Sequence, residues 1–170
     1  MQWVRSEGPT AIAVLLTTAG TITLGIAYGF QYVGSLQPCQ LCLYQRWSWW
    51  IAVLLGLIAI NFRGRELFQR IAVGYAAISI LSGAVIAIFH VGVEQFWWEG
   101  HEICTGVGES AITIDALKKQ IMNTPVTRCD DTTWALFDIT MAGYNAFVSI
   151  TAGMGGLILL HLTKWRPTHE

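Results

Sequence analysis

The feature that most restricts the fold is the stretch from Gly8 to Gln45, which contains no acidic or basic residue. Within it, residues 11–30 are apolar enough to cross a bilayer core, which takes about 20 helical residues. This run exceeds the apolar part of a cleaved signal peptide, usually about 7 to 15 residues, so we expect a retained membrane anchor. Only 12% of the 170 residues are charged, against about a quarter in soluble domains. The chain is therefore predicted to be an integral membrane protein.

Three more apolar runs are long enough to cross the membrane, and each ends near charged or aromatic residues. They are residues 43–62, 71–90 and 139–162. Together with the first run they predict an all-α membrane protein, a four-transmembrane-helix bundle that forms a single domain over residues 1–170. In the fourth run, four small residues are spaced to line a close helix contact. These are Ala142, Ala146, Ser149 and Gly153.

Four spans place both termini on one side of the membrane and the segments 31–42 and 91–138 on the other. The side with the termini holds most of the basic residues near the helix ends, namely Arg5, Arg63, Arg65, Arg70, Lys164 and Arg166. Because Lys and Arg favour the cytoplasmic side, we expect cytoplasmic termini and, in a bacterial inner membrane, periplasmic loops. The long acidic loop has apolar residues at helical spacing over residues 111–122, which predicts a short interfacial helix.

Aromatic residues gather near the outer ends of the predicted spans, among them Trp47, Trp49 and Trp50. Such belts are typical of the membrane–water interface. The net charge is -1 and there is no basic run, so nothing indicates a nucleic-acid partner.

The four cysteines form a close pair, Cys39 and Cys42, and a wide pair, Cys104 and Cys129. On the predicted topology all four lie in an oxidising compartment, where disulfides persist. Pro38 precedes the close pair and Arg46 follows one helical turn later. A helix start and a nearby Arg both favour the reactive thiolate, so Cys42 is well placed to be ionised.

Three other uses of these residues agree less well with the sequence. Zinc is disfavoured because structural zinc sites usually pair close-spaced ligands, whereas Cys104 and Cys129 are far apart, and we expect no metal. A permanent disulfide between Cys39 and Cys42 would close too small a loop to stabilise much, while close spacing suits thiol exchange. Haem is disfavoured because the chain has no Cys-x-x-Cys-His motif and its His90 and His161 lie at opposite membrane faces.

These motifs resemble the disulfide bond formation protein B (DsbB) family of bacterial inner-membrane thiol oxidases. The likeness runs from the first span to the fourth, and its most specific part is Pro38-Cys39-Gln40-Leu41-Cys42 through Gln45-Arg46. Further matches are the segment 90–95, Cys104, the segment 126–130 and the segment 142–146. Some members of the family carry Glu where Gln45 stands in this chain.

The resemblance implies a thiol:quinone oxidoreductase that generates protein disulfides. A periplasmic DsbA-like oxidase of the thioredoxin fold would pass electrons to Cys104 and Cys129, then to Cys39 and Cys42, and finally to ubiquinone or menaquinone. By position, Cys104 would form the mixed disulfide with the partner and Cys129 would exchange with Cys39. Cys42 would face the quinone together with Arg46 and His90.

Redox potentials favour the same direction of electron flow. DsbA has a reduction potential of about -120 mV, so an ordinary structural disulfide, with a potential of about -300 mV, could not reoxidise it. A further acceptor is needed, and a quinone in the lipid would supply it. Two rivals remain open: a related enzyme with a dedicated partner or running in the reductive direction, and a non-catalytic scaffold with two structural disulfides.

Overall fold

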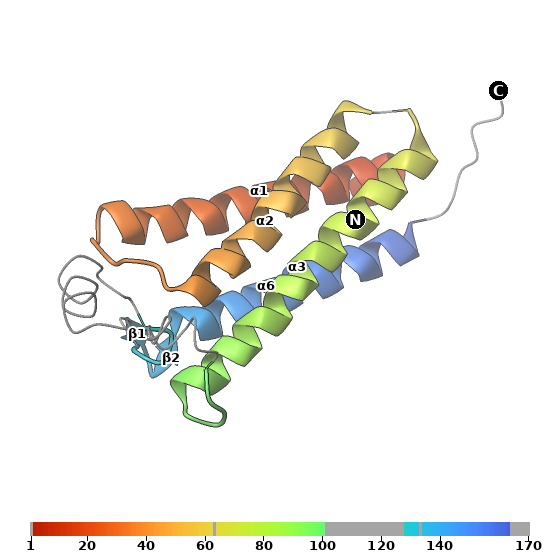
Figure 1. Ribbon diagram of the computed structural model, residues 1–170. Helices are drawn as coiled ribbons and strands as arrows, with labels where there is room; N and C mark the ends of the chain where they lie inside the picture. Colours follow the sequence, from red (N-terminus) through yellow and green to blue (C-terminus); the bar gives the residue numbers. More distant parts are fainter. Residues whose placement is uncertain (1, 63, 101–127, 133, 164–170) are drawn as a thin grey trace, which may run out of the picture.

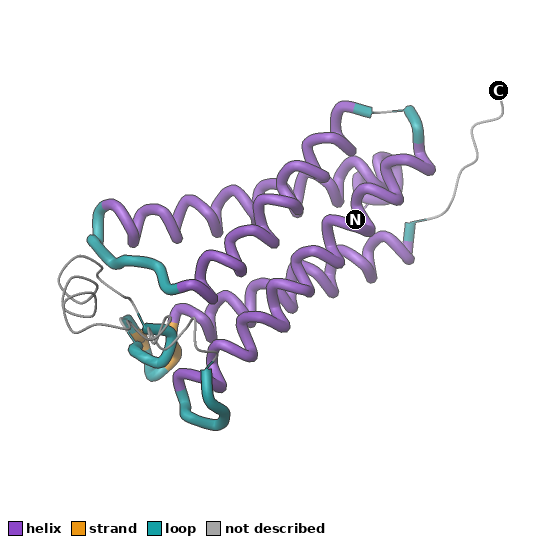
Figure 2. The backbone as a smooth tube through the Cα atoms, viewed as in Figure 1, coloured by secondary structure: helices purple, strands orange, loops and turns teal. Residues whose placement is uncertain are grey.

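The computed structural model describes residues 2–62, 64–100, 128–132 and 134–163. Four long helices dominate it, and two very short strands precede the last one (Figures 1 and 2). The helices are α1 (Gln2–Tyr32), α2 (Gln40–Asn61), α3 (Glu66–Glu94) and α6 (Met141–Leu162). The strands are β1 (Ala135–Leu136) and β2 (Ile139–Thr140).

Each of the four helices is long and apolar enough to cross a membrane. The predicted four-helix membrane bundle is therefore confirmed as the fold. Helix α3 packs along both α2 and α6, and α1 packs mainly along α2. The interfacial helix predicted at residues 111–122 lies outside the described residues.

The helices differ from the predicted spans at several ends. Helix α2 begins at Gln40, three residues before the predicted start, because the side chain of Cys39 caps it. Helix α3 runs on to Glu94, beyond the expected end at residue 90, so Glu94 belongs to the helix and not to the loop 91–138. Helix α6 begins at Met141 and not at residue 139, because Ile139 and Thr140 pair with β1.

Helix α1 contains a break near its start. Gly8 has φ 35° and ψ -111°, outside the helical region, and Pro9 follows it. Proline suits the first position of a helix because it lacks the N–H that would have no partner there. The apolar span accordingly runs from Gly8 to Tyr32.

The strands β1 and β2 form a tight hairpin directly before α6. Its two loop residues, Phe137 and Asp138, both have positive φ, the conformation of a type I′ turn. The hairpin ends at Thr140, whose hydroxyl accepts a hydrogen bond from the backbone N–H of Gly143 and so caps α6. The hairpin therefore fixes where the last helix starts.

Small residues allow the helices to approach closely. The predicted stripe on α6 is confirmed, because Ala142, Ala146, Ser149 and Gly153 are all buried. A Cβ atom added at Gly153 would lie 2.6 Å from the side chain of Leu81 on α3. Such contacts drive helix association in lipid, where the hydrophobic effect between helices is weak.

One prediction about the aromatic belt is wrong. Trp47 and Trp50 are 66% and 46% exposed, as belt residues would be, but Trp49 is only 2% exposed. Consecutive helical positions point in directions about 100° apart, so neighbours in the sequence reach different surroundings. Trp49 faces the bundle interior and belongs to the core.

Candidate functional site

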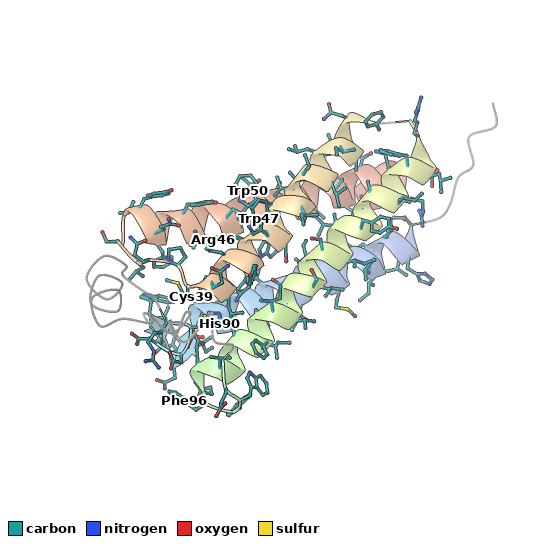
Figure 3. All side chains as sticks on the ribbon, viewed as in Figure 1. Cys39, Arg46, Trp47, Trp50, His90 and Phe96 are labelled. Atoms are coloured by element: carbon teal, nitrogen blue, oxygen red, sulfur yellow. The ribbon has the colours of Figure 1, made fainter. Side chains whose placement is uncertain are left out.

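Cys39 and Cys42 lie at the start of α2, at the end of the bundle that also carries Cys129 and is called here the sulfur end (Figures 1 and 3). Their Sγ atoms are 2.9 Å apart, with the thiol of Cys39 donating to the sulfur of Cys42. The backbone N–H of Cys42 in turn donates to Cys39 Sγ, 3.3 Å away. The two sulfurs are thus in reach of each other at a helix start, as the sequence predicts.

Cys129 is brought to the same place from a distant part of the chain. It is fully buried and clusters with Cys39, Leu41 and Val93. Its side chain shares a hydrogen bond with Cys39. The structure therefore gathers three of the four cysteines, while Cys104 lies outside the described residues.

The thiol of Cys39 is held in its protonated form. Its hydrogen bonds to Cys129 and then to Cys42, with burial, keep its pKa well above the ordinary value. Cys39 is only 5% exposed. A buried thiol of this kind is inert until a neighbouring sulfur reacts with it.

His90, from α3, is the third group against Cys39, and Figure 3 shows the two side by side at the sulfur end. Its Nε2 lies 3.6 Å from Cys39 Sγ and 3.2 Å from the carbonyl oxygen of Cys129. Its Nδ1 lies 3.0 Å from Gln45 Nε2. At 3% exposure, His90 is enclosed by protein and lies against both Cys39 and Cys129.

A mainly apolar cavity of about 220 Å³ opens beside the cysteines, between α1, α2 and α6. Cys42 lines it, whereas Cys39 does not. Its walls include Leu24, Ile26 and Phe30 of α1. A few polar groups among apolar walls are the usual pattern of a small-molecule site.

Arg46 is the charged residue of this cavity. Its guanidinium donates to the side chain of Gln31 and, at 3.2 Å, to the carbonyl of Ala27. It also lies 5.0 Å from the ring centroid of Tyr28, a cation–π distance. These contacts with α1 fix the charge one helical turn from Cys42.

Polar side chains also connect the cavity to His90. Gln45 and Asn145 both line the cavity. The amide of Asn145 donates to Gln45 Oε1 at 2.5 Å, and the indole N–H of Trp49 donates to Asn145 Oδ1 at 2.9 Å. Three helices are joined by this set of hydrogen bonds.

On the other side of His90 lies a buried carboxyl group. Glu94 is 9% exposed, and its Oε1 is 3.7 Å from His90 Nε2. Its Oε2 accepts a 2.6 Å hydrogen bond from Thr140, the capping residue of α6. The β1–β2 hairpin is thereby tied to the histidine.

Ligand atoms of Cys39, Cys42 and His90 lie within 4.8 Å of one another, which raises the question of a metal. Two thiolates bound to one zinc ion at about 2.3 Å in tetrahedral geometry would be about 3.8 Å apart. The observed separation is 2.9 Å, with one sulfur donating to the other. This geometry fits a redox pair better than a zinc site.

Sequence reasoning missed the roles of three residues that the structure places at the site. Glu94 falls within the predicted loop 91–138, although it lies four residues after His90, the spacing of one helix face. Gln45 and Asn145 entered only as parts of matching motifs, although each is a strongly polar residue within an apolar span. In contrast to Cys42 and Arg46, the predicted quinone contact His90 lies behind Gln45 and does not line the cavity.

Comparison with known proteins gives a consistent result. A family model described as "Disulfide bond formation protein DsbB" matches residues 9–159. An uncharacterized protein of Rickettsia prowazekii is 24% identical over 169 residues, which cover 98% of this chain and 94% of the relative. Disulfide bond formation protein B of Nitrosospira multiformis is 27% identical over 154 residues, covering 88% and 89%. No solved structure matches the chain significantly.

Proposed function

The chain belongs to the disulfide bond formation protein DsbB family, and on that premise we propose that it is a quinone-dependent oxidase of a periplasmic DsbA-like protein. Membership itself makes it a multi-pass membrane thiol oxidase acting in disulfide bond formation. The proposal adds the electron acceptor, the partner and the residues involved. We place the protein in the bacterial inner membrane with its sulfur end toward the periplasm, because basic residues flank the opposite end.

The observation that carries the proposal is the position of Cys42. Its side chain lines the cavity, while its sulfur is 2.9 Å from Cys39, which in turn hydrogen-bonds with Cys129. Electrons arriving at Cys129 could therefore reach the cavity by sulfur–sulfur exchange: a Cys129 thiolate would attack Cys39 of a Cys39–Cys42 disulfide and release Cys42, and a second exchange would free Cys39. In each exchange a thiolate attacks a disulfide, one S–S bond forms, another breaks, and the released sulfur carries the electron pair.

The residues around the cavity fit a quinone head group. The apolar walls suit a lipid-soluble ring, and Arg46, Gln45 and Asn145 supply hydrogen-bonding groups for carbonyl oxygens. When bound, a ubiquinone or menaquinone would accept the two electrons released by disulfide formation. Arg46 would stabilise both the Cys42 thiolate and the negative charge that develops at the carbonyl nearest to it.

We assign the first step to Cys104, by its match to the family motif. Cys104 would form the mixed disulfide with the partner, and the resulting Cys104–Cys129 dithiol would then be reoxidised at Cys39. A thioredoxin-fold oxidase would be the partner because it exposes a reactive dithiol.

Turnover by the purified full-length protein tests the proposal. We expect the protein in lipid nanodiscs to oxidise a reduced DsbA-like protein only when a soluble quinone is present, with one quinone reduced for each disulfide formed. Cys42→Ser should abolish turnover while the thermal unfolding midpoint stays near that of the parent. Ser82→Ala, on the exposed surface of α3, is the matched control and should turn over normally.

Three outcomes would redirect the proposal. Absence of any quinone-coupled turnover in the unmodified protein would favour a scaffold with structural disulfides. Faster reaction of an oxidised partner with quinol would favour the reductive direction. Oxidation of only one of several thioredoxin-fold proteins would indicate a dedicated partner.

A further inference from the structure

A continuous set of hydrogen bonds runs from Trp49 to Cys129. The indole Nε1 of Trp49 bonds Asn145 Oδ1 at 2.9 Å, and Asn145 Nδ2 bonds Gln45 Oε1 at 2.5 Å. Gln45 Nε2 is 3.0 Å from His90 Nδ1, and His90 Nε2 is 3.2 Å from the carbonyl oxygen of Cys129. The set crosses α2, α6 and α3 and starts on the wall of the cavity.

The groups at the two ends give this set a fixed direction. An indole N–H can only donate, so Asn145 has to present its oxygen to Trp49 and its NH₂ group to Gln45. Gln45 then accepts with its oxygen and donates with its own NH₂ group to His90 Nδ1. At the far end the carbonyl of Cys129 can only accept, which requires a hydrogen on His90 Nε2. The donor at Trp49 and the acceptor at Cys129 therefore require the same form of neutral His90, with its hydrogen on Nε2 and none on Nδ1.

From this direction we propose that Gln45 and Asn145 are positioning residues that keep His90 in the tautomer with its hydrogen on Nε2. This places an N–H donor between the sulfur of Cys39, 3.6 Å away, and the carbonyl of Cys129. The inference deepens the proposed function and rests on it for its catalytic meaning, because it assigns His90 a task in the exchange between the two cysteines.

The arrangement decides what His90 can do. A neutral histidine whose Nε2 already carries a hydrogen cannot accept the proton of Cys39 through that nitrogen. It can instead donate a hydrogen bond to a sulfur on which negative charge develops during exchange. The proton of Cys39 is directed elsewhere, toward the sulfur of Cys42 2.9 Å away.

The surroundings of Nε2 agree with a donor at this position. Glu94 Oε1, 3.7 Å away, belongs to a carboxyl group whose other oxygen already accepts from Thr140. The thiol of Cys39 donates toward Cys42. A hydrogen on His90 Nε2 therefore points into a group of acceptors, of which the carbonyl oxygen of Cys129 at 3.2 Å is the nearest.

Nitrogen NMR of the histidine side chains in the ¹⁵N-labelled full-length protein in nanodiscs tests this directly, since the two nitrogens of a neutral ring differ strongly in shift when only one carries hydrogen. We expect His90, assigned by its loss in His90→Asn, to show a hydrogen-bearing Nε2 and a bare Nδ1 near neutral pH. A hydrogen on Nδ1 alone, or a pattern averaged between the two nitrogens, would overturn the proposal.

Asn145→Asp provides the second arm of the experiment. The new carboxylate still accepts from Trp49 but has no hydrogen to give to Gln45, so Gln45 must reverse and present its oxygen to His90. We expect Nδ1 of His90 to become hydrogen-bearing, and disulfide exchange to slow by about tenfold, as suits the loss of one hydrogen bond to a charged group.

The matched control is Trp50→Phe. This variant also removes an indole donor from α2, but the indole of Trp50 bonds the hydroxyl of Tyr28 and not Asn145. It should leave the His90 shifts unchanged. An unchanged His90 spectrum in Asn145→Asp would also overturn the proposal, and the wild-type spectrum decides the tautomer should that variant fail to fold. Because the spectra require neither quinone nor partner, a failure here is separate from a failure of the proposed oxidase activity.

Discussion

Gln45 at the sulfur end and Gln69 at the other end of the bundle are both 5% exposed, and both join neighbouring helices. The amide of Gln69 donates to the hydroxyl of Thr10 on α1 and to the carbonyl of Ala59 on α2, each at 2.9 Å. Gln45 instead bonds Asn145 and His90. A buried amide is costly without partners at either end, so burial alone does not distinguish a structural role from a functional one.

The difference lies in where the hydrogen bonds lead. Those of Gln69 end on groups that do not titrate in the accessible pH range. Those of Gln45 lead to a histidine that contacts a cysteine sulfur, and Gln45 itself lines a cavity. The comparison teaches that the same residue type can hold helices together at one end and connect a binding cavity to reactive groups at the other.

Two arginines extend the comparison, and of the residues compared between the two ends they give the largest expected effect on activity. Arg46→Gln should lower quinone-dependent turnover by about a hundredfold, in the range seen when one donor to a developing negative charge is removed. Its thermal midpoint should fall only modestly, because the loss is limited to the hydrogen bonds from the guanidinium to Gln31 and to the carbonyl of Ala27 and to the contact with Tyr28. Steady-state kinetics at varied quinone concentration provide the measurement.

Arg70→Gln is the counterpart at the other end. Arg70 donates to the carbonyls of Leu160 and Thr163 and so satisfies the last turn of α6. We expect lower stability with normal turnover per folded molecule. A hundredfold loss of turnover in Arg70→Gln, or none in Arg46→Gln, would contradict the assignment of the two ends.

The glutamines themselves supply the next effect in size. Gln45→Leu and Gln69→Leu should each destabilise the protein by about 1–3 kcal/mol, because each leaves buried polar partners without a hydrogen bond. Only Gln45→Leu should also reduce turnover, by about tenfold, since His90 then loses its orienting partner. Denaturant unfolding and turnover of the same preparations separate the two roles, and equal losses of turnover in both variants would contradict the distinction.

Substitutions in the middle of the bundle, between the two ends, should change stability through helix packing alone. Gly153→Ala would bring a Cβ atom within 2.6 Å of Leu81, and overpacking of this kind costs about 1–3 kcal/mol. Gly155→Ala, where nothing lies within 4 Å, is the matched control and should be neutral. Thermal unfolding in nanodiscs gives the midpoints of both variants. Equal midpoints would contradict the prediction and show that α3 and α6 can move apart at this contact at little cost.

The sequence was sufficient for the spans and for the stripe of small residues, because length, hydropathy and spacing are local properties. It also identified the cysteine pairs and Arg46 as candidates. It could not show that Trp49 is buried or that Asn145 meets Gln45, since these two partners are 100 residues apart and their contact depends on helix packing. The proposed roles of Cys39, Cys42, Cys104, Cys129, Arg46 and His90 remain predictions.

The C-terminal end of α3 shows the same limit on a smaller scale. Residues 91–94 read as the start of the long hydrophilic loop because the uncharged run ends at His90. In the folded chain Glu94 is buried and hydrogen-bonds with Thr140, which allows α3 to continue by one more turn. The partner that makes this possible comes from the hairpin before α6, and no local pattern reports it.

The smallest expected effect concerns the exposed ion pair next to Cys129. The guanidinium of Arg128 makes hydrogen bonds of 2.9 and 2.6 Å to the carboxylate of Asp130 and holds the pKa of that carboxyl below its ordinary value of 3.8. A lowered carboxyl pKa contributes stability that is fully present above pH 3.8 and is lost as the pH falls through the folded-state value. Salt should weaken the pair, since exposed charges are screened.

Arg128→Gln should therefore raise the pKa of Asp130 toward 3.8, as measured by carboxyl ¹³C NMR titration of the full-length protein between about pH 2 and pH 6, a range that brackets the ordinary value. Arg65→Gln, at the other end of the bundle, is the control and should leave the Asp130 titration unchanged. Stability at neutral pH should change little, because exposed ion pairs contribute little to it. Turnover should therefore stay close to that of the parent protein. A large loss of turnover in Arg128→Gln, with the titration of Asp130 unaltered, would instead assign Arg128 to the binding of the partner.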